Sequence, residues 1–122
     1  MSSYAFDANI LIDALNGHPP AYREITRTER PCISRIVYIE VLSKDVGTRL
    51  PTVQRFLDRF WIDELDAEIA AHAAALRRER SRLKLPDATI LATAQVRQRI
   101  LVTRNTKDFP ANMPGIRVPY LI

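Results

Sequence analysis

Cysteine, histidine and glycine are scarce in this 122-residue sequence, and their scarcity excludes several kinds of site. The single cysteine, Cys32, cannot form an internal disulfide, and its apolar neighbours predict a small buried residue in a reducing compartment. Two histidines, His18 and His72, have no partner at metal-ligand spacing, which argues against zinc. The three glycines form no phosphate-cradling loop, and there is no Gly-x-Ser-x-Gly turn, so nucleotide-binding loops and serine hydrolases of that type are excluded.

Long apolar runs are also missing. No segment approaches the about 20 apolar residues that span a bilayer, and the start, Met1-Ser2-Ser3-Tyr4, lacks the basic and apolar regions of a signal peptide. We therefore expect a cytoplasmic protein without membrane contact. The composition, 47% hydrophobic and 26% charged, is typical of globular proteins, and the length predicts a single domain over 1–122. The net charge of +4 favours polyanionic partners without specifying nucleic acid.

Strand-like and helical patterns alternate along the chain. We expect strands at 4–6, 32–34, 61–62, 100–103 and 116–118, and helices at 10–15, 21–30, 35–44, 51–60, 67–83 and 86–96, with a single turn at 106–109. Repeated alternation of this kind predicts an α/β fold with a mostly parallel central sheet and helices on both faces.

Three acidic residues occupy positions at which a functional site is expected. Asp7 follows the first strand, at the sheet edge where ligand sites gather, although Asp also suits the cap of the next helix. Glu40 lies in a helix that is apolar almost all round, so the alternatives are a buried salt bridge and a metal ligand. Asp87 begins a helix and shares a face with Ile90 and Leu91, which directs it toward the core. Carboxylates from three separate segments predict a magnesium site, with manganese as an alternative.

In this order the residues resemble the motifs of PIN-domain nucleases, and among them the VapC-type toxins of toxin-antitoxin pairs. The resemblance covers nearly the whole chain and is carried by four segments, YAFDANILI (4–12), ISRIVYIEVL (33–42), LPDATILATA (85–94) and LVTRNTKDF (101–109). It implies a three-layer PIN fold, magnesium-dependent cleavage of RNA phosphodiester bonds, a homodimer and neutralisation by a cognate antitoxin. The alternative is a PIN-domain binding module that is directed to DNA or has no catalytic activity.

The resemblance also implies roles for individual residues. Asp7 and Asp87 are expected to ligate the metal. Glu40 is expected to ligate it directly or through a water, and to orient the attacking water. Their supporting residues would be Asn9, Ser34 and Thr103, although Thr103 is equally suited to be an ordinary β-branched strand residue.

Two residues of this chain are candidates for the fourth acidic position of the family. Many relatives carry an acid where this sequence has Asn105, and Asp108 stands three residues later. Reach from the strand favours Asn105, whereas charge favours Asp108. We expect Asn105 to act through its oxygen or a bridging water, with Asp108 in a supporting position.

A run of cations follows the alanine-rich helix. It consists of Arg77, Arg78, Arg80, Arg82 and Lys84, interrupted among charged residues only by Glu79. Such a run is typical of a solvated helix end, and it could equally grip RNA phosphates through Arg78 and Arg82.

Overall fold

The fold is an α/β sandwich built on one parallel sheet. The structure, a computed structural model, describes residues 3–44 and 47–122, so Met1 and Ser2 of the start discussed above lie outside it. In this part of the chain, five strands pair in the order β3-β2-β1-β4-β5, and every pair is parallel. Their bounds are Ser3–Phe6 (β1), Cys32–Ser34 (β2), Trp61–Asp63 (β3), Arg99–Val102 (β4) and Ile116–Arg117 (β5). The predicted α/β class with a parallel sheet is confirmed.

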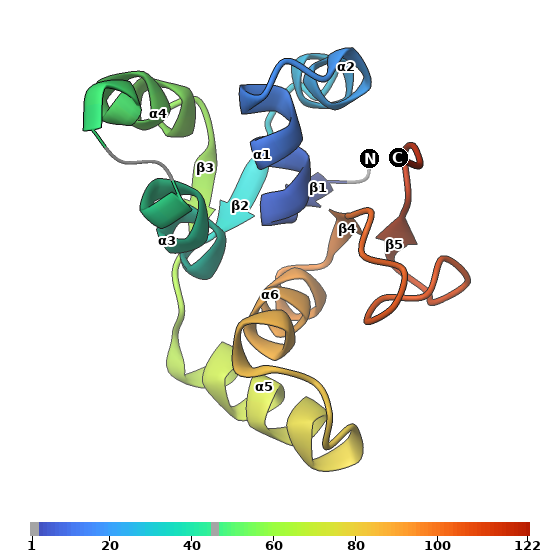
Figure 1. The fold of residues 1–122 in the computed structure, drawn as a ribbon. Helices are drawn as coiled ribbons and strands as arrows, with labels where there is room; N and C mark the ends of the chain where they lie inside the picture. Colours follow the sequence, from blue (N-terminus) through green and yellow to red (C-terminus); the bar gives the residue numbers. More distant parts are fainter. Residues whose placement is uncertain (1–2, 45–46) are drawn as a thin grey trace.

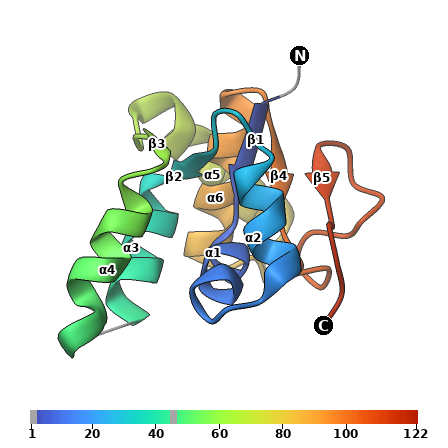
Figure 2. The ribbon, with the colours of Figure 1, turned by 90° about the horizontal axis from the view of Figure 1, so that it is seen from above.

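Helices lie on both faces of this sheet. Their bounds are Ala8–Leu15 (α1), Pro19–Thr26 (α2), Arg35–Lys44 (α3), Leu50–Leu57 (α4), Ala67–Glu79 (α5) and Leu85–Val96 (α6), with a 3-10 turn at Gly47–Arg49. Figure 1 and Figure 2 show α1 and α2 on one face and α5 and α6 on the other, while α3 and α4 form a hairpin beside β2 and β3. The first residues of α1, α3 and α6 therefore meet near one end of the sheet.

The core explains why α6 is fixed so firmly. Every residue from Ala88 to Ala94 is buried, because the helix lies between the sheet and α5. Two threonines inside this stretch satisfy their hydroxyls on the helix backbone, Thr89 on the Leu85 carbonyl at 2.8 Å and Thr93 on the Thr89 carbonyl at 2.7 Å. Asp87 thus begins a helix that has little freedom to move. Cys32 is also buried, as predicted.

Three helices end earlier than the sequence pattern predicts. The helix expected over 67–83 stops at Glu79, the one expected over 51–60 stops at Leu57, and the one expected over 21–30 covers Pro19–Thr26. Leu83 misled the prediction because it is buried without being helical: it sits in a turn in which its N–H donates to the Arg80 carbonyl at 2.9 Å. The spacing of apolar residues predicts which side chains are buried, but a buried side chain can lie in a turn as well as in a helix.

The environment expected for Glu40 is also corrected. Within α3 only Val37 and Val41 are buried, and Ile39 is 52% exposed. The helix is therefore open on one side, and Glu40 is half-buried rather than enclosed. In the part of the chain that the structure describes, no helix combines the length and apolar character needed to cross a bilayer.

Candidate active site

Asp7 is the most enclosed acid at this end of the sheet. It follows β1 directly and caps α1, since the Ala8 N–H donates to its Oδ1 at 2.8 Å. Its Oδ2 accepts from the Thr103 hydroxyl at 2.7 Å and from the Asn9 amide at 3.2 Å. Burial raises the pKa of Asp7, although these hydrogen bonds and the Arg104 charge oppose the rise. The capping and the functional interpretations of Asp7 are therefore compatible, because one oxygen caps the helix and the other faces Thr103.

Neighbouring carboxylates act on the pKa values of both Glu40 and Asp87. Partial burial raises the pKa of Glu40, and the charges of Asp7 and Asp87 raise it further. Burial also raises the pKa of Asp87, to about 6, together with the charges of Asp108 and Asp7 and a hydrogen bond with Asp108. Since charges act in this way only at short range, the structure brings together the acids of all four sequence motifs.

The fourth motif places Asn105 and Asp108 against each other. The Asn105 side-chain N–H donates to the Asp108 Oδ2 at 3.0 Å, and the Asp108 N–H donates to the Asn105 Oδ1 at 3.3 Å. Both ends of the Asn105 amide are thus engaged by Asp108, whose carboxylate also reaches Asp87. The Asp108 carbonyl in turn accepts from Arg80 at 2.7 Å, which holds this loop to the end of α5.

The three residues expected to support the acids differ in what they touch. Thr103, fully buried, bonds to Asp7 and also accepts the Asn105 backbone N–H at 3.0 Å. Asn9 links the same groups, because its amide also lies 3.3 Å from the Thr103 hydroxyl. Ser34 instead accepts the Val37 N–H at 3.2 Å and so starts α3, the helix that carries Glu40.

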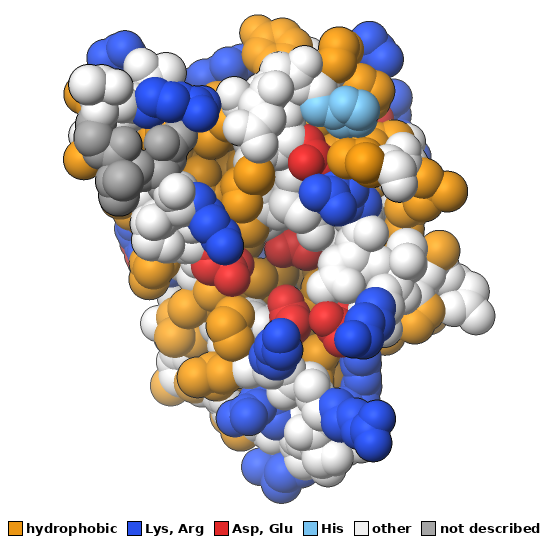
Figure 3. Space-filling model, viewed as in Figure 1, with side chains coloured by type: hydrophobic (Ala, Val, Ile, Leu, Met, Phe, Trp, Pro, Cys, Tyr) orange, Lys and Arg blue, Asp and Glu red, His pale blue; other side chains and the backbone are white. Residues whose placement is uncertain are grey.

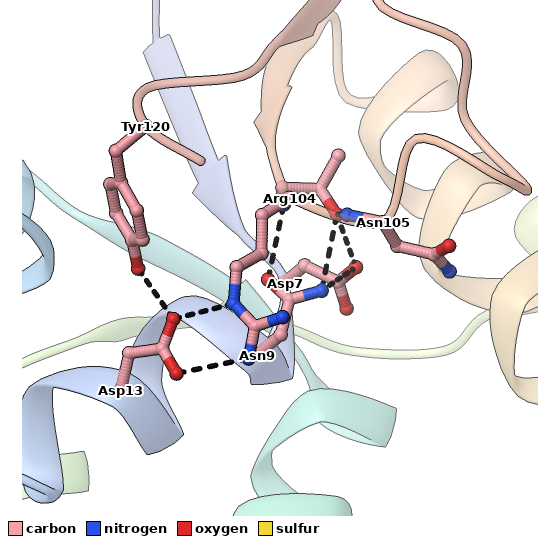
Figure 4. A network of polar contacts seen from close by, with 7 residues as sticks. Asp7, Asn9, Asp13, Arg104, Asn105 and Tyr120 are labelled. Carbon is pink, nitrogen blue, oxygen red and sulfur yellow. Dashed lines mark hydrogen bonds and ion pairs between the residues drawn. The ribbon is translucent and has the colours of Figure 1, made fainter. Parts of the chain in front are cut away.

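One network beside the acids was missed by the sequence analysis. Arg104 donates to Asp13 through Nε at 2.6 Å and Nη2 at 3.0 Å, and the Tyr120 hydroxyl donates to the same carboxylate at 2.8 Å (Figure 4). Burial alone would raise the pKa of Asp13, but these hydrogen bonds outweigh it and lower the pKa. The Arg104 N–H also donates to the Asn9 Oδ1 at 3.3 Å, so the network ties the C-terminal segment to the loop after β4. No local pattern in the sequence signals these pairings.

The charge of these acids suits a hard divalent cation, although their side chains are not arranged as a complete metal site. Acidic side chains gather near the centre of the face seen in Figure 3, with Lys and Arg side chains around them. Among residues 3–44 and 47–122, no three Asp, Glu, His or Cys side chains are grouped closely enough to hold a metal ion as they stand. Neighbouring carboxylates nevertheless raise the pKa of Glu40 and Asp87, which marks crowded negative charge that a divalent cation with oxygen ligands would offset.

Comparison with known proteins assigns the chain to a family. The family model described as PIN domain matches residues 4–112, which include all four motifs. The chain belongs to the PIN-domain nucleases. Within this family it is 30% identical to the tRNA(fMet)-specific endonuclease VapC of Salmonella typhimurium, over 97% of each chain. The family resemblance seen in the sequence is therefore confirmed, including the similarity to VapC-type enzymes.

Similar solved structures agree with this assignment. A chain of a toxin-antitoxin complex from Klebsiella pneumoniae superposes with a TM-score of 0.88 and is 42% identical, over 98% of this chain and 100% of that one. A chain of the DNA-bound VapBC complex from Salmonella typhimurium superposes with a TM-score of 0.79 at 27% identity, over 96% of both chains.

Proposed function

We propose that this protein is a magnesium-dependent endoribonuclease that acts as the toxin of a VapBC-type pair. The observation that carries the proposal is the meeting of acids from four motifs at one end of a parallel sheet. Burial raises the pKa of Asp7, Glu40 and Asp87, and neighbouring carboxylates raise the pKa of Glu40 and Asp87 further. Manganese has the same preference for oxygen ligands and is the alternative cofactor.

The proposed metal ligands are Asp7, Asp87 and Asp108, with Glu40 at the more open side. These residues would hold magnesium, whose positive charge would polarise a phosphate, favour ionisation of a water and offset charge on the leaving oxygen. We assign the fourth position to Asp108 rather than Asn105, because Asp108 lies against Asp87. Both ends of the Asn105 amide are instead hydrogen-bonded to Asp108.

The chain's own residues prepare this chemistry. Thr103 and Asn9 fix the Oδ2 of Asp7, so this oxygen keeps one orientation when the charge around it changes. Glu40, whose pKa is raised and whose side chain is half-exposed, is placed to accept a proton from an attacking water. No residue has to form a covalent bond to the substrate.

The comparisons also suggest partners. The Klebsiella pneumoniae structure is a toxin-antitoxin complex and the Salmonella typhimurium structure is a VapBC complex, which supports an antitoxin that binds this chain. We propose the cytoplasm as the compartment of the pair. The proposal of a homodimer rests on the resemblance to VapC-type toxins, and the exposed apolar side chains of Ile39 and Leu85, 52% and 59% exposed, are available to such an interface. The Salmonella typhimurium relative is named as tRNA(fMet)-specific, so initiator tRNA is the first substrate to test.

The test is a cleavage assay with the purified full chain. It should include initiator tRNA, an unstructured RNA and DNA, each with magnesium, manganese or EDTA. We expect metal-dependent cleavage of RNA that is lost in Asp7→Asn and kept in Asp58→Asn, a matched change at an exposed acid after α4. RNA cleavage that survives both EDTA and Asp7→Asn would contradict the proposal, and cleavage of DNA alone would favour a DNA-directed protein.

A further inference from the structure

Asp7, Glu40, Asp87 and Asp108 are called the acid cluster below. Three cations border this cluster, each beside a different acid and each from a different segment of the chain. Lys44 lies one helical turn after Glu40 at the end of α3, and Lys84 is the cap residue three positions before Asp87 at the start of α6. Arg104 follows Thr103, and its backbone N–H bonds to Asn9, which in turn bonds to Asp7. Residues four apart on a helix are neighbours, which places Lys44 beside Glu40. The charges of Lys84 and Arg104 act on Asp87 and Asp7, respectively.

Neither lysine is used to neutralise the acid beside it. Lys44 and Lys84 are exposed, and within the described residues no ion pair joins Lys44 to Glu40 or Lys84 to Asp87. Their charges lower the pKa of these acids only against larger effects that raise it. Both ammonium groups are therefore placed near the acids while remaining open to a further anion.

Arg104 is held differently, and more rigidly. Asp13 takes two of the five guanidinium N–H donors in a paired arrangement, while the Arg104 side chain stays 35% exposed (Figure 4). A guanidinium fixed in this way loses little freedom when it also binds a phosphate. Asp13 thus positions a cation at the edge of the acid cluster near Asp7.

A polymer substrate needs such cations. A carboxylate cluster with its metal accommodates one phosphate, but the same carboxylates repel the phosphates on either side of it. Lysine and arginine at the border offset that repulsion without reading the bases, since contacts to phosphate position a strand and do not specify its sequence.

We propose that Lys44, Lys84 and Arg104 bind backbone phosphates that flank the scissile one, so that the RNA strand crosses the acid cluster between α3, α6 and the loop after β4. This inference rests on the proposed ribonuclease function. The proposed path of the RNA does not use Arg78 and Arg82. These two arginines are exposed, Arg78 in the last turn of α5 and Arg82 in the turn that follows.

The experiment measures binding of a labelled single-stranded RNA at several salt concentrations, with calcium replacing magnesium to prevent cleavage. The logarithm of the binding constant falls as the logarithm of the salt concentration rises, and each phosphate contact to a single strand makes this slope steeper by about 0.7. The triple Gln variant of Lys44, Lys84 and Arg104 should therefore make the slope shallower by about 2. The matched control replaces the exposed arginines Arg23, Arg55 and Arg59, whose charges shift the pKa of none of the cluster acids in the described structure, and should leave the slope unchanged.

A second variant separates phosphate binding from a structural role of Arg104. Arg104→Lys keeps the charge but loses the paired contact with Asp13, so we expect a lower melting temperature with a nearly normal salt slope, and Arg104→Gln should lower both. The inference is overturned if the triple variant keeps the wild-type slope, or if the slope falls only when Arg78 and Arg82 are replaced. If the wild-type protein binds and cleaves no RNA while it still binds magnesium, the proposed function fails together with the inference.

Discussion

Replacing Asp87 by Asn should stabilise the metal-free protein while abolishing its activity. Asp87 begins α6, and its carboxylate lies partly buried beside Asp108 and within the field of Asp7. Asn has almost the same shape, carries no charge, and its amide can donate to Asp108 as a protonated Asp87 does. The substitution therefore removes the repulsion and keeps the contact, and it also removes a proposed metal ligand.

The magnitude follows from the raised pKa. Below pH 3.8 the Asp87 carboxyl is protonated in both the folded and the unfolded chain, so its charge costs nothing. Between 3.8 and about 6 the folded protein binds the proton more tightly, so the free energy of unfolding falls as pH rises. At about 1.4 kcal/mol per pKa unit, the loss above pH 6 is about 3 kcal/mol at most. Because the side chain is partly exposed, we expect Asp87→Asn to gain about 1 to 3 kcal/mol at pH 7.

Urea unfolding in EDTA at pH 7 and near pH 4 tests this expectation. The advantage of Asp87→Asn over wild type should be present at pH 7 and shrink toward zero near pH 4. Magnesium at a hundredfold excess over its Kd should stabilise the wild type by about 2.7 kcal/mol and Asp87→Asn by much less. Asp58→Asn serves as the control in each condition. If Asp87→Asn is no more stable than wild type at pH 7, the repulsion that we infer at this site does not exist.

Four further substitutions test other features of the structure. Asp108→Asn should weaken magnesium binding as severely as Asp87→Asn, whereas Asn105→Ala should weaken it only about ten- to a hundredfold by calorimetry; the reverse order would assign the fourth position to Asn105. Arg80→Gln removes the bond to the Asp108 carbonyl, so urea unfolding should show a loss of about 1 to 3 kcal/mol together with weaker magnesium binding. Asp63→Asn leaves the Arg99 guanidinium unpaired and should cost about 2 to 4 kcal/mol in the same assay while sparing cleavage per folded molecule.

Local sequence patterns predicted the features that local physics controls. Asp7 was placed correctly after a strand and before a helix because an apolar run, an acid and a second apolar run determine that junction without reference to the rest of the chain. The strands at 32–34 and 61–62 were found in the same way, since short apolar runs lie between helices there. Parallel pairing then follows from the alternation of strands and helices.

Contacts between distant segments were beyond such patterns. Arg99 of β4 reaches Asp63 of β3 at 2.7 and 2.8 Å, although β1 and β2 lie between these strands. Cys32 of β2 lies close to both partners, since the charges of Arg99 and Asp63 act on the pKa of its thiol in opposite directions. Nothing in the sequence near Arg99 or Asp63 indicates this partner. The open side of α3 was missed for a related reason, because exposure of Ile39 depends on where the neighbouring helices end.

The position of Arg104 shows how the chain separates two electrostatic requirements that conflict. A nuclease site of this kind needs carboxylates that are free to bind a metal and cations that are free to bind phosphate, yet the two attract each other at short range. If Arg104 paired with Asp7, both groups would be neutralised and neither could serve the substrate. Asp13, set one helical turn beyond Asn9 on α1, binds the guanidinium instead, and Tyr120 fixes Asp13 by a second bond. Asp7 is then left with neutral donors from Thr103, Asn9 and the backbone, which orient its oxygens without cancelling their charge.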